Sequence, residues 1–363
     1  MAIHFHPLAV KRISPDAAGS AAITLAVPDA LRDRFAFRPG QFLTLRATIA
    51  GEETRRSYSI CSSCQRYLQT GEIDIGIKPV DEGCFSRWAL AQLKPGMAIE
   101  AMPPDGRFTP RIARARHRVG FAAGSGITPM LSIIATTLAD EPNSSFTLVY
   151  GNQRINTIMF NEALQDLKDS YPARLSLIHL LSRQAQELEL LNGRIDEAKV
   201  AELLRTVVPA GSIDEAFLCG PAGMIDSAQR ALVAAGVSAD RVHSERFIPA
   251  SPGVVKKPPE KSATLAAADG TAQRLDVVLD GKTHHLAMRD GEKVLDTALD
   301  AGLDLPYSCR GGVCCTCRAR VLEGEVEMEK NYTLEQAEID KGFVLTCQAV
   351  PRSRHVVVSY DDR

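Results

Sequence analysis

Four cysteines near the C-terminus have the residue type and spacing to bind iron. Cys309, Cys314 and Cys317 follow the pattern C-x4-C-x2-C, and Cys347 comes 30 residues after the third. This is the plant-type spacing of the thiolates that hold a [2Fe–2S] cluster. Because such a cluster carries one electron at a time, the sequence indicates a protein that receives electrons and passes them on.

The residues between these cysteines suit a tight loop. Gly311 and Gly312 permit positive φ and close approach, so that backbone N–H groups can point at sulfur. Structural zinc usually shows two C-x2-C-like pairs, and only one is present here. A disulfide set would need a secreted context, which nothing in the sequence supports. Cys315 breaks the ligand spacing, and we interpret it as a free thiol beside the site.

The composition is that of an ordinary globular chain. Its 363 residues are enough for two or three domains, and they are 45% hydrophobic and 24% charged. The net charge of −2 argues against nucleic-acid binding. No signal peptide is expected. The uncharged run 119–139 contains glycines and a proline, which favour a buried strand, loop and helix over a membrane span. The nine cysteines, four of them expected ligands, fit a reducing cytoplasm.

A second group of residues could bind a flavin. On a strand, Arg56 and Tyr58 would share one side, where the guanidinium can pair with a phosphate and the ring can stack on a flat cofactor. Ser59 could hydrogen-bond the edge of that cofactor. A nearby helix start could bind a pyrophosphate through its N–H groups and one hydroxyl. The residues at that helix start are Gly83, Cys84, Phe85 and Ser86. The alternatives are an ordinary strand with an exposed Arg and a plain capped helix.

Two turns, each between an expected strand and an expected helix, could bind a dinucleotide. Glycine lets the backbone approach phosphates, and the carboxyl ends of parallel strands are where open α/β sheets bind ligands. The first turn contains Gly124, Ser125, Gly126, Ile127 and Thr128, and the second contains Cys219, Gly220, Pro221, Ala222 and Gly223. Cys219 is either a reactive thiol or, as we favour, a small polarizable group facing a nicotinamide.

An arginine after another expected strand could select the phosphorylated nucleotide. Ser182 and Arg183 follow the strand expected over 175–181, and Arg suits a 2′-phosphate. Arg194 is a second candidate. The alternative for both arginines is an ordinary solvated charge.

The chain divides into three expected domains. Residues 1–110 read as short alternating strands of a small antiparallel β-barrel, one of them over 55–61. Residues 111–248 alternate strands and helices, one helix over 157–167, as in a parallel sheet covered by helices. Residues 249–270 are expected to be a proline-containing linker. After it, 271–363 should form two strands joined at Asp280-Gly281, a helix near 292–301 capped by Asp290, and the cysteine loop.

The order of these motifs resembles the ferredoxin–NADP reductase superfamily. With the plant-type cysteine loop at the C-terminus, the chain resembles the single-chain oxygenase reductases over essentially its whole length. The resemblance includes Phe5-His6-Pro7-Leu8, Asn192-Gly193-Arg194-Ile195-Asp196 and Glu245-Arg246-Phe247. The chain departs from the family pattern at Cys315, where relatives usually carry Ser or a small residue, and at Arg154, one place later than expected.

The resemblance implies FAD in the barrel, NADPH on the two turns, and a C-terminal β-grasp ferredoxin domain. It also implies that Tyr58, Cys219, Glu245 and Phe247 lie near the reacting rings. The implied final acceptor is a di-iron oxygenase, namely the subunits of a phenylacetyl-CoA epoxidase acting in phenylacetate catabolism. Oxygenases acting on benzoyl-CoA, ring-hydroxylating enzymes, and a role as a non-catalytic redox sensor are the alternatives.

Overall fold

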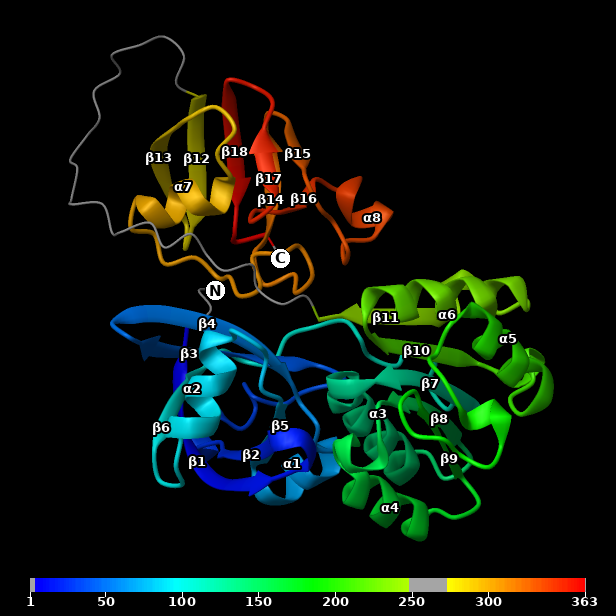
Figure 1. The fold of residues 1–363 in the computed structure, drawn as a ribbon. Coiled ribbons are helices and arrows are strands. Elements are labelled where there is room, and N and C mark those ends of the chain that lie inside the picture. Colours follow the sequence, from blue (N-terminus) through cyan, green and yellow to red (C-terminus); the bar gives the residue numbers. More distant parts are fainter. Residues whose placement is uncertain (1–3, 248–272, 363) are drawn as a thin grey trace. The chain divides into compact units, whose positions relative to one another are not determined.

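The computed structural model describes residues 4–247 and 273–362. One compact unit runs from Phe5 to Phe247, and the described residues after 272 belong to a second. The first unit holds an antiparallel barrel and a parallel α/β domain, and the second is built on a mixed sheet (Figure 1). The fold class predicted from the sequence is therefore confirmed. The expected linker at 249–270 lies outside the described residues.

The barrel is a six-stranded antiparallel sheet in the order β4-β3-β6-β1-β2-β5. A bridge between Ile60, which follows β4, and Ile75 of β5 joins the two edges of the sheet. Alternating apolar residues such as Leu8, Leu25 and Leu45 fill its interior. The strands are β1 (His6–Pro15), β2 (Ala21–Ala26), β3 (Phe42–Ile49), β4 (Glu52–Ser59), β5 (Glu72–Ile77) and β6 (Ala98–Ala101).

Two helices cover this barrel. They are α1 (Cys64–Thr70) and α2 (Cys84–Gln92), and short 3-10 turns lie at Ala17–Gly19 and Asp29–Leu31. Ser63 caps α1 by accepting the N–H of Arg66, and Gly71 ends it at a φ of 68°. Both signals favour a helix at this place, although the sequence analysis predicts none there.

Strand β4 begins earlier than expected. The predicted range is 55–61, whereas the strand spans Glu52–Ser59. The reason is a two-residue hairpin turn at Ala50 and Gly51, which have φ values of 53° and 85°. This turn pairs Ile49 with Glu52, so that the strand already begins at polar residues. Those residues show no alternation of apolar and polar side chains, and the sequence pattern therefore does not indicate them as part of a strand.

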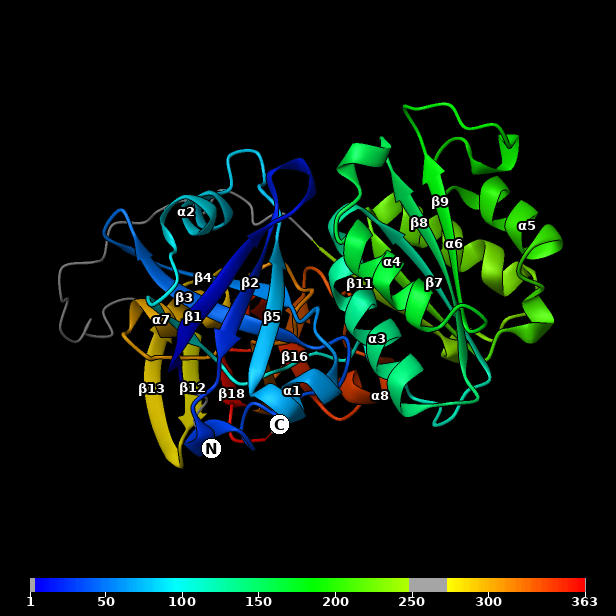
Figure 2. The same cartoon turned by 90° about the horizontal axis from the view of Figure 1, so that it is seen from below.

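The α/β domain contains a five-stranded parallel sheet in the order β11-β10-β7-β8-β9. Its strands are β7 (His117–Ala123), β8 (Ser145–Asn152), β9 (Leu175–Leu181), β10 (Glu215–Gly220) and β11 (Val242–Arg246). Helices α3 and α4 pack on one face, and α5 and α6 on the other (Figure 2). The helices are α3 (Ile127–Asp140), α4 (Asn161–Ser170), α5 (Glu197–Thr206) and α6 (Ala222–Ala234). Short 3-10 turns lie at Gly124–Gly126, Ile155–Thr157, Glu189–Leu191, Ala210–Ser212 and Ala239–Arg241.

Helix α4 was predicted to begin at Thr157 but begins at Asn161. Phe160 has a left-handed φ of 57°, which interrupts any helix entering from residue 157. The carboxylate of Asp16, in the barrel, accepts the N–H of Phe160 at 3.0 Å. A contact between distant residues therefore sets this boundary, and local propensity could not indicate it.

A buried ionic network holds the segment that enters the α/β domain against the parallel sheet. The fully buried guanidinium of Arg118 pairs with Glu215 at 3.0 Å and with Glu141 at 2.6 Å. It also donates to the carbonyl of Ile112, in the segment entering the α/β domain, at 2.6 Å. His243 pairs with Glu215 at 3.1 Å. Each buried charge thus has partners, which offsets the desolvation penalty.

The run 119–139 forms strand β7, the Gly124–Gly126 turn and most of helix α3, as expected. Among the described residues, no helix is both long and apolar enough to cross a membrane.

The second unit contains a five-stranded sheet in the order β13-β12-β18-β14-β16 and a two-stranded ribbon of β15 and β17. Helix α7 (Val294–Asp300) buries its apolar side against the core, and α8 (Gln336–Ile339) is a short helix. The strands are β12 (Gln273–Leu279), β13 (Lys282–Met288), β14 (Arg318–Glu323), β15 (Val326–Met328), β16 (Phe343–Leu345), β17 (Ala349–Pro351) and β18 (His355–Ser359).

The predicted hairpin at Asp280-Gly281 is present, with positive φ at both residues. The Asp361 carboxylate accepts both N–H groups of this turn at 2.8 Å. The predicted cap of α7 at Asp290 is wrong. Lys293 is the residue before the helix, because a turn at Asp290 and Gly291 delays its start.

Candidate active site

The two glycine-containing turns lie side by side at one edge of the parallel sheet. Strands β7 and β10 are neighbours, and Ala122 pairs with Cys219. A Cβ atom on Gly126 would lie 2.1 Å from the carbonyl oxygen of Cys219, so only glycine fits there. Helices α3 and α6 begin just after these turns. Two glycine-containing turns at the carboxyl ends of neighbouring parallel strands are suited to a dinucleotide.

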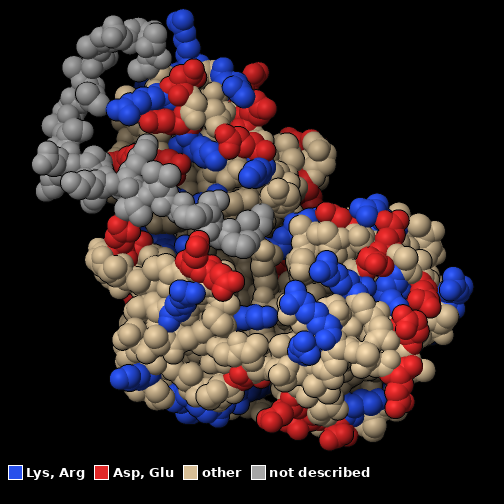
Figure 3. All heavy atoms as spheres, in the orientation of Figure 1, with Lys and Arg blue, Asp and Glu red and all other residues tan. Residues whose placement is uncertain are grey.

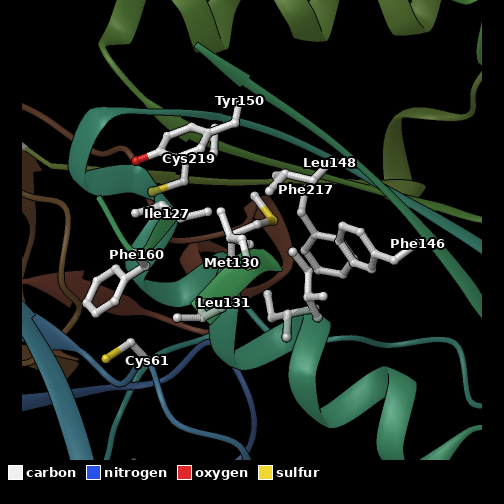
Figure 4. Packing of buried hydrophobic residues seen from close by; sticks show 14 of the residues in the cluster. Cys61, Ile127, Met130, Leu131, Phe146, Leu148, Tyr150, Phe160, Phe217 and Cys219 are labelled. Atoms are coloured by element: carbon white, nitrogen blue, oxygen red, sulfur yellow. The ribbon is translucent and has the colours of Figure 1, made fainter. Parts of the chain in front are cut away.

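Hydrogen bonds fix the first turn. The hydroxyl of Tyr150 donates to the carbonyl of Gly124 at 2.8 Å, and that of Thr128 donates to the carbonyl of Ser125 at 3.0 Å. Figure 4 shows Tyr150 and Ile127 close to Cys219. The turn is therefore rigid. In the second turn, Pro221 is the residue before α6, and Gly220 leaves room for Met224, whose Cε would lie 2.8 Å from an added Cβ.

Three predicted residues converge where the barrel meets the α/β domain. Cys219 of β10 pairs with Glu245 of β11. The hydroxyl of Ser59, from barrel strand β4, donates to the Glu245 carboxylate at 3.3 Å. Burial raises the pKa of Glu245 to about 8, and the hydrogen bond from Ser59 opposes this shift. Glu245 can therefore hold a proton near neutral pH.

Cys219 is completely buried. Burial, and then the nearby Glu245 charge, raises the pKa of its thiol well above the usual range. A neutral thiol is a poor nucleophile. This agrees with the interpretation of Cys219 as a small polarizable group rather than a reactive thiol. Phe247 follows β11 with 39% of its surface exposed.

Arg56 and Tyr58 share a side of β4, as expected. The ring of Tyr58 lies 5.7 Å from that of Phe85, at a tilt of 41°. Burial raises the pKa of Tyr58, so its hydroxyl stays protonated. The guanidinium of Arg56 donates to the carbonyl of Arg55 at 2.7 Å. A partly exposed tyrosine ring beside a guanidinium fits a flavin and its phosphate.

The start of α2 fits a pyrophosphate through its backbone. A Cβ atom on Gly83 would lie 2.8 Å from the hydroxyl oxygen of Ser86 and 2.9 Å from Val80. That hydroxyl accepts the N–H of Val80 at 3.2 Å, so it also holds the turn in shape. Cys84 is exposed. Phe85 is buried in the barrel core and can offer a ligand only its backbone N–H.

Lys78 is a residue that the sequence analysis missed. It follows β5 of the barrel, yet its Nζ lies 3.7 Å from the Cβ position of Gly124 in the first nucleotide turn. A positive charge there faces the place where phosphates would approach. A single lysine after a strand has no motif, and only the packing of the two domains brings it to the turn.

The arginines expected to read a 2′-phosphate lie along one sheet edge. The N–H of Arg183 donates to the carbonyl of Gln153 at 2.9 Å, and that of Gly193 donates to Leu181 at 3.0 Å. These bonds join the three segments that carry Arg154, Arg183 and Arg194, and all three arginines are exposed. The polar side chains of this edge are those of Arg154, Ser182, Arg183 and Arg194.

The four predicted cluster ligands form two pairs of thiols. Cys314 donates a hydrogen bond to Cys309, and Cys317 donates one to Cys347. These bonds lower the pKa of Cys309 to about 6 and also lower that of Cys347, while the pKa values of the two donors rise. The N–H of Gly311 donates to the sulfur of Cys309 at 3.3 Å.

This pairing fits a two-iron cluster. Structural zinc needs four ligands around one ion. A [2Fe–2S] cluster takes four thiolates, which suits two thiol pairs.

Cys315 lies between Cys314 and Cys317 in the sequence. It packs in the hydrophobic core of the second unit and has a left-handed φ of 56°. Its backbone conformation turns the loop between Cys314 and Cys317.

On the face drawn in Figure 3, basic and acidic side chains are interspersed.

Three family models match successive parts of the chain. An oxidoreductase FAD-binding domain matches residues 9–109, an oxidoreductase NAD-binding domain matches 121–230, and a 2Fe-2S iron-sulfur cluster binding domain matches 277–352.

Relatives with the same arrangement cover nearly the whole chain. It is 46% identical to the E component of 1,2-phenylacetyl-CoA epoxidase from Escherichia coli over 98% of both chains. It is 35% identical to the ferredoxin reductase component of 3-ketosteroid-9-alpha-monooxygenase from Rhodococcus rhodochrous, over 97% of this chain and 96% of that one. The structure of phthalate dioxygenase reductase matches over 98% of both chains, with a TM-score of 0.59 and 20% identity.

These matches and the fold confirm the resemblance to flavin- and iron–sulfur-containing reductases. The chain belongs to the family of oxygenase reductase components that join an FAD-binding, an NAD-binding and a 2Fe-2S domain in one polypeptide, and it is an oxidoreductase of that family.

Proposed function

We propose that this chain passes electrons from NADPH, through FAD and a [2Fe–2S] cluster, to the di-iron oxygenase subunits of a phenylacetyl-CoA epoxidase in the cytoplasm. The observation that supports electron transfer from nucleotide to flavin is that Ser59, Cys219 and Glu245 lie together at the boundary between the barrel and the α/β domain. When bound, the nucleotide supplies a hydride, the flavin divides the electron pair, and the cluster accepts single electrons.

The barrel residues bind and orient the flavin. Arg56 neutralises a phosphate, Tyr58 stacks on the ring system and Ser59 hydrogen-bonds its edge. The first turn of α2, from Gly83 to Ser86, would hold the pyrophosphate. Because Tyr58 packs against Phe85, the two halves of this site are held together.

The ends of β7 and β10 would hold the nucleotide. The turns at 124–128 and 219–221 would bind the sugar–phosphate backbone of the nucleotide, and Lys78 adds a positive charge from the barrel side. Cys219 faces the nicotinamide as a neutral group. Glu245 holds a proton beside it, and Phe247 lies at the end of the same strand.

Arg183, with Ser182 and Arg194, selects NADPH over NADH by pairing with the 2′-phosphate. The change Arg183→Ala should therefore weaken NADPH binding at least tenfold and leave NADH nearly unaffected, because only NADPH carries that phosphate. Affinities can be measured by titrating flavin reduction. Lys78→Met is the matched control and should weaken both nucleotides alike. Equal losses for both nucleotides in Arg183→Ala would reject the phosphate assignment.

The epoxidase assignment rests on the 46% identical relative, which carries that name. The ketosteroid monooxygenase reductase, at 35% identity, supports the same device serving another oxygenase as the second candidate. Oxygenases acting on benzoyl-CoA and ring-hydroxylating enzymes belong to that alternative. A non-catalytic sensor would show negligible NADPH turnover with cytochrome c or ferricyanide.

One experiment tests the electron route. The protein is purified anaerobically, its flavin, iron and sulfide are quantified, and it is titrated with NADPH and NADH under visible and electron paramagnetic resonance (EPR) spectroscopy. We expect one FAD and one cluster per chain, both reduced by NADPH. Colourless protein without sulfide would overturn the route. Adding purified epoxidase core then tests the acceptor, and NADPH-driven epoxidation of phenylacetyl-CoA is the expected result.

A further inference from the structure

A glutamine lies directly beside one of the expected cluster ligands. Gln348 follows Cys347 in the turn between β16 and β17, and only 2% of its surface is exposed. Its N–H donates to the carbonyl of Leu345 at 2.8 Å, and its carbonyl accepts the N–H of Glu329 at 3.0 Å. The backbone at Gln348 is thus fixed on both sides, which aims the side chain into the loop that carries the other ligands.

The carboxamide of Gln348 connects the two thiol pairs. Its Nε2 donates to the carbonyl of Arg310 at 2.9 Å, next to Cys309 of the first pair. It also lies 2.8 Å from the carbonyl and 3.7 Å from the sulfur of Cys347, in the second pair. An amide nitrogen has two N–H bonds, so one goes to Arg310 and the other is shared between the two Cys347 acceptors.

The same side chain supports the strained part of the cluster loop. Arg310 and Gly312 have φ values of 53° and 78°, both left-handed. A Cβ atom on Gly312 would lie 3.2 Å from Cγ of Gln348, so the stem of the glutamine packs against the loop. A buried donor at this place both holds the loop and lies beside a ligand sulfur.

Resting on the proposed function, we propose that Gln348 is a positioning residue that locks the two cysteine pairs in register and raises the reduction potential of the cluster. Hydrogen bonds to ligand sulfurs stabilise the more negative, reduced state of such clusters. The amide acts through Cys347 and the Arg310 loop, and it takes no part in hydride transfer.

The test replaces Gln348 with methionine, which has a similar length but no N–H donor. We expect Gln348→Met to shift the cluster potential to a more negative value, to change the EPR spectrum of the reduced cluster, and to release iron to a chelator several-fold faster. The rate of flavin reduction by NADPH should stay unchanged, because that reaction precedes the cluster.

Thr346→Val is the matched control on the other side of Cys347. The Thr346 hydroxyl donates to the carbonyl of Cys317 at 2.9 Å and accepts from Tyr360 at 2.7 Å, and within the described residues it makes no hydrogen bond to a ligand sulfur. This change should lower stability without moving the potential. Should Gln348→Met fail to hold a cluster, Gln348→Asn keeps the amide but shortens its reach, and a smaller shift in the same direction is expected.

The outcomes separate this inference from the proposed function. A parent protein without a [2Fe–2S] EPR signal would contradict the proposed function itself. A parent cluster whose potential is unchanged in both Gln348 variants would overturn only the role of Gln348. An equal shift in Thr346→Val would also overturn it, because the effect would then be general loosening of the loop.

Discussion

At the scale of single residues, neighbouring cysteines have different environments. Cys314 is hydrogen-bonded to Cys309, whereas Cys315 belongs to the hydrophobic core cluster of the second unit, which also includes Cys317 and Cys347. Cys315 also has a left-handed backbone conformation, with a φ of 56°. The cysteine spacing predicts that Cys314 is a cluster ligand and that Cys315 is not.

We predict that Cys314→Ser abolishes the cluster and that Cys315→Ser retains most of it. The first change removes one thiolate of a pair, while the second exchanges a buried thiol for a group of similar size. Iron and sulfide content, together with the visible spectrum, measure both outcomes. The opposite pattern would mean that Cys315 is the ligand.

Glu245 gives a prediction about pH. Its pKa is raised to about 8 in the folded protein from an ordinary value of 4.5, so the folded state keeps a proton that the unfolded state releases. Its contribution to stability is fully present below pH 4.5 and is lost as the pH rises to about 8. Urea unfolding of the parent and of Glu245→Gln, from pH 5 to pH 9, should show this slope only in the parent. A slope of the same size in both proteins would assign it to other groups.

At the scale of elements, the turn that follows strand β7 packs tightly against the end of strand β10. An added methyl group at Gly126 has no room, because the opposing atoms belong to the backbone of Cys219 and Gly220. Backbone cannot rotate away as a flexible side chain does. The turn after β7 and the turn after β10 are therefore held at a fixed distance from each other.

We expect Gly126→Ala to push the two turns apart and to weaken both NADPH and NADH binding by tenfold or more. Gly211→Ala is the control, since nothing lies within 4 Å of its Cβ position. Nucleotide titration of flavin reduction, with circular dichroism to verify folding, measures the effect. A normal nucleotide affinity in Gly126→Ala would show that nucleotide binding tolerates a wider separation of the two turns.

The sequence predicts helices and strands well where the apolar periodicity is strong. It fails where contacts between residues far apart in the sequence determine the start of an element or the position of a side chain. Strand β9 is predicted at its observed bounds because five of its seven residues are apolar, and only Ser176 and His179 interrupt them. The start of α4 depends on Asp16, and Lys78 reaches its turn only through the packing of barrel and sheet. The thiol spacing predicted the cluster site, because three of its four members lie in one short loop.

At the scale of the whole molecule, the chain forms two compact units that share a covalent connection. Electron transfer between them requires an encounter. A tether provides an effective concentration on the order of millimolar, far above that of separate proteins in dilute solution.

Residues 1–248 and 271–363, produced as two polypeptides, should therefore divide the reaction. The first should retain flavin and NADPH–ferricyanide turnover, whereas cluster reduction should become second order in the added second polypeptide. Stopped-flow spectroscopy at several concentrations gives the order. A concentration-independent rate would mean that the units associate tightly without the tether.

The place of β18 in its sheet has a consequence for biosynthesis. This strand, His355–Ser359, lies between β12 and β14 although it follows both of them in the sequence. The nascent chain thus cannot close the sheet beside Cys347 until residues 355–359 have left the ribosome. We therefore expect iron and sulfide to be inserted after those residues have been made, into a chain whose residues 5–247 have already had time to fold.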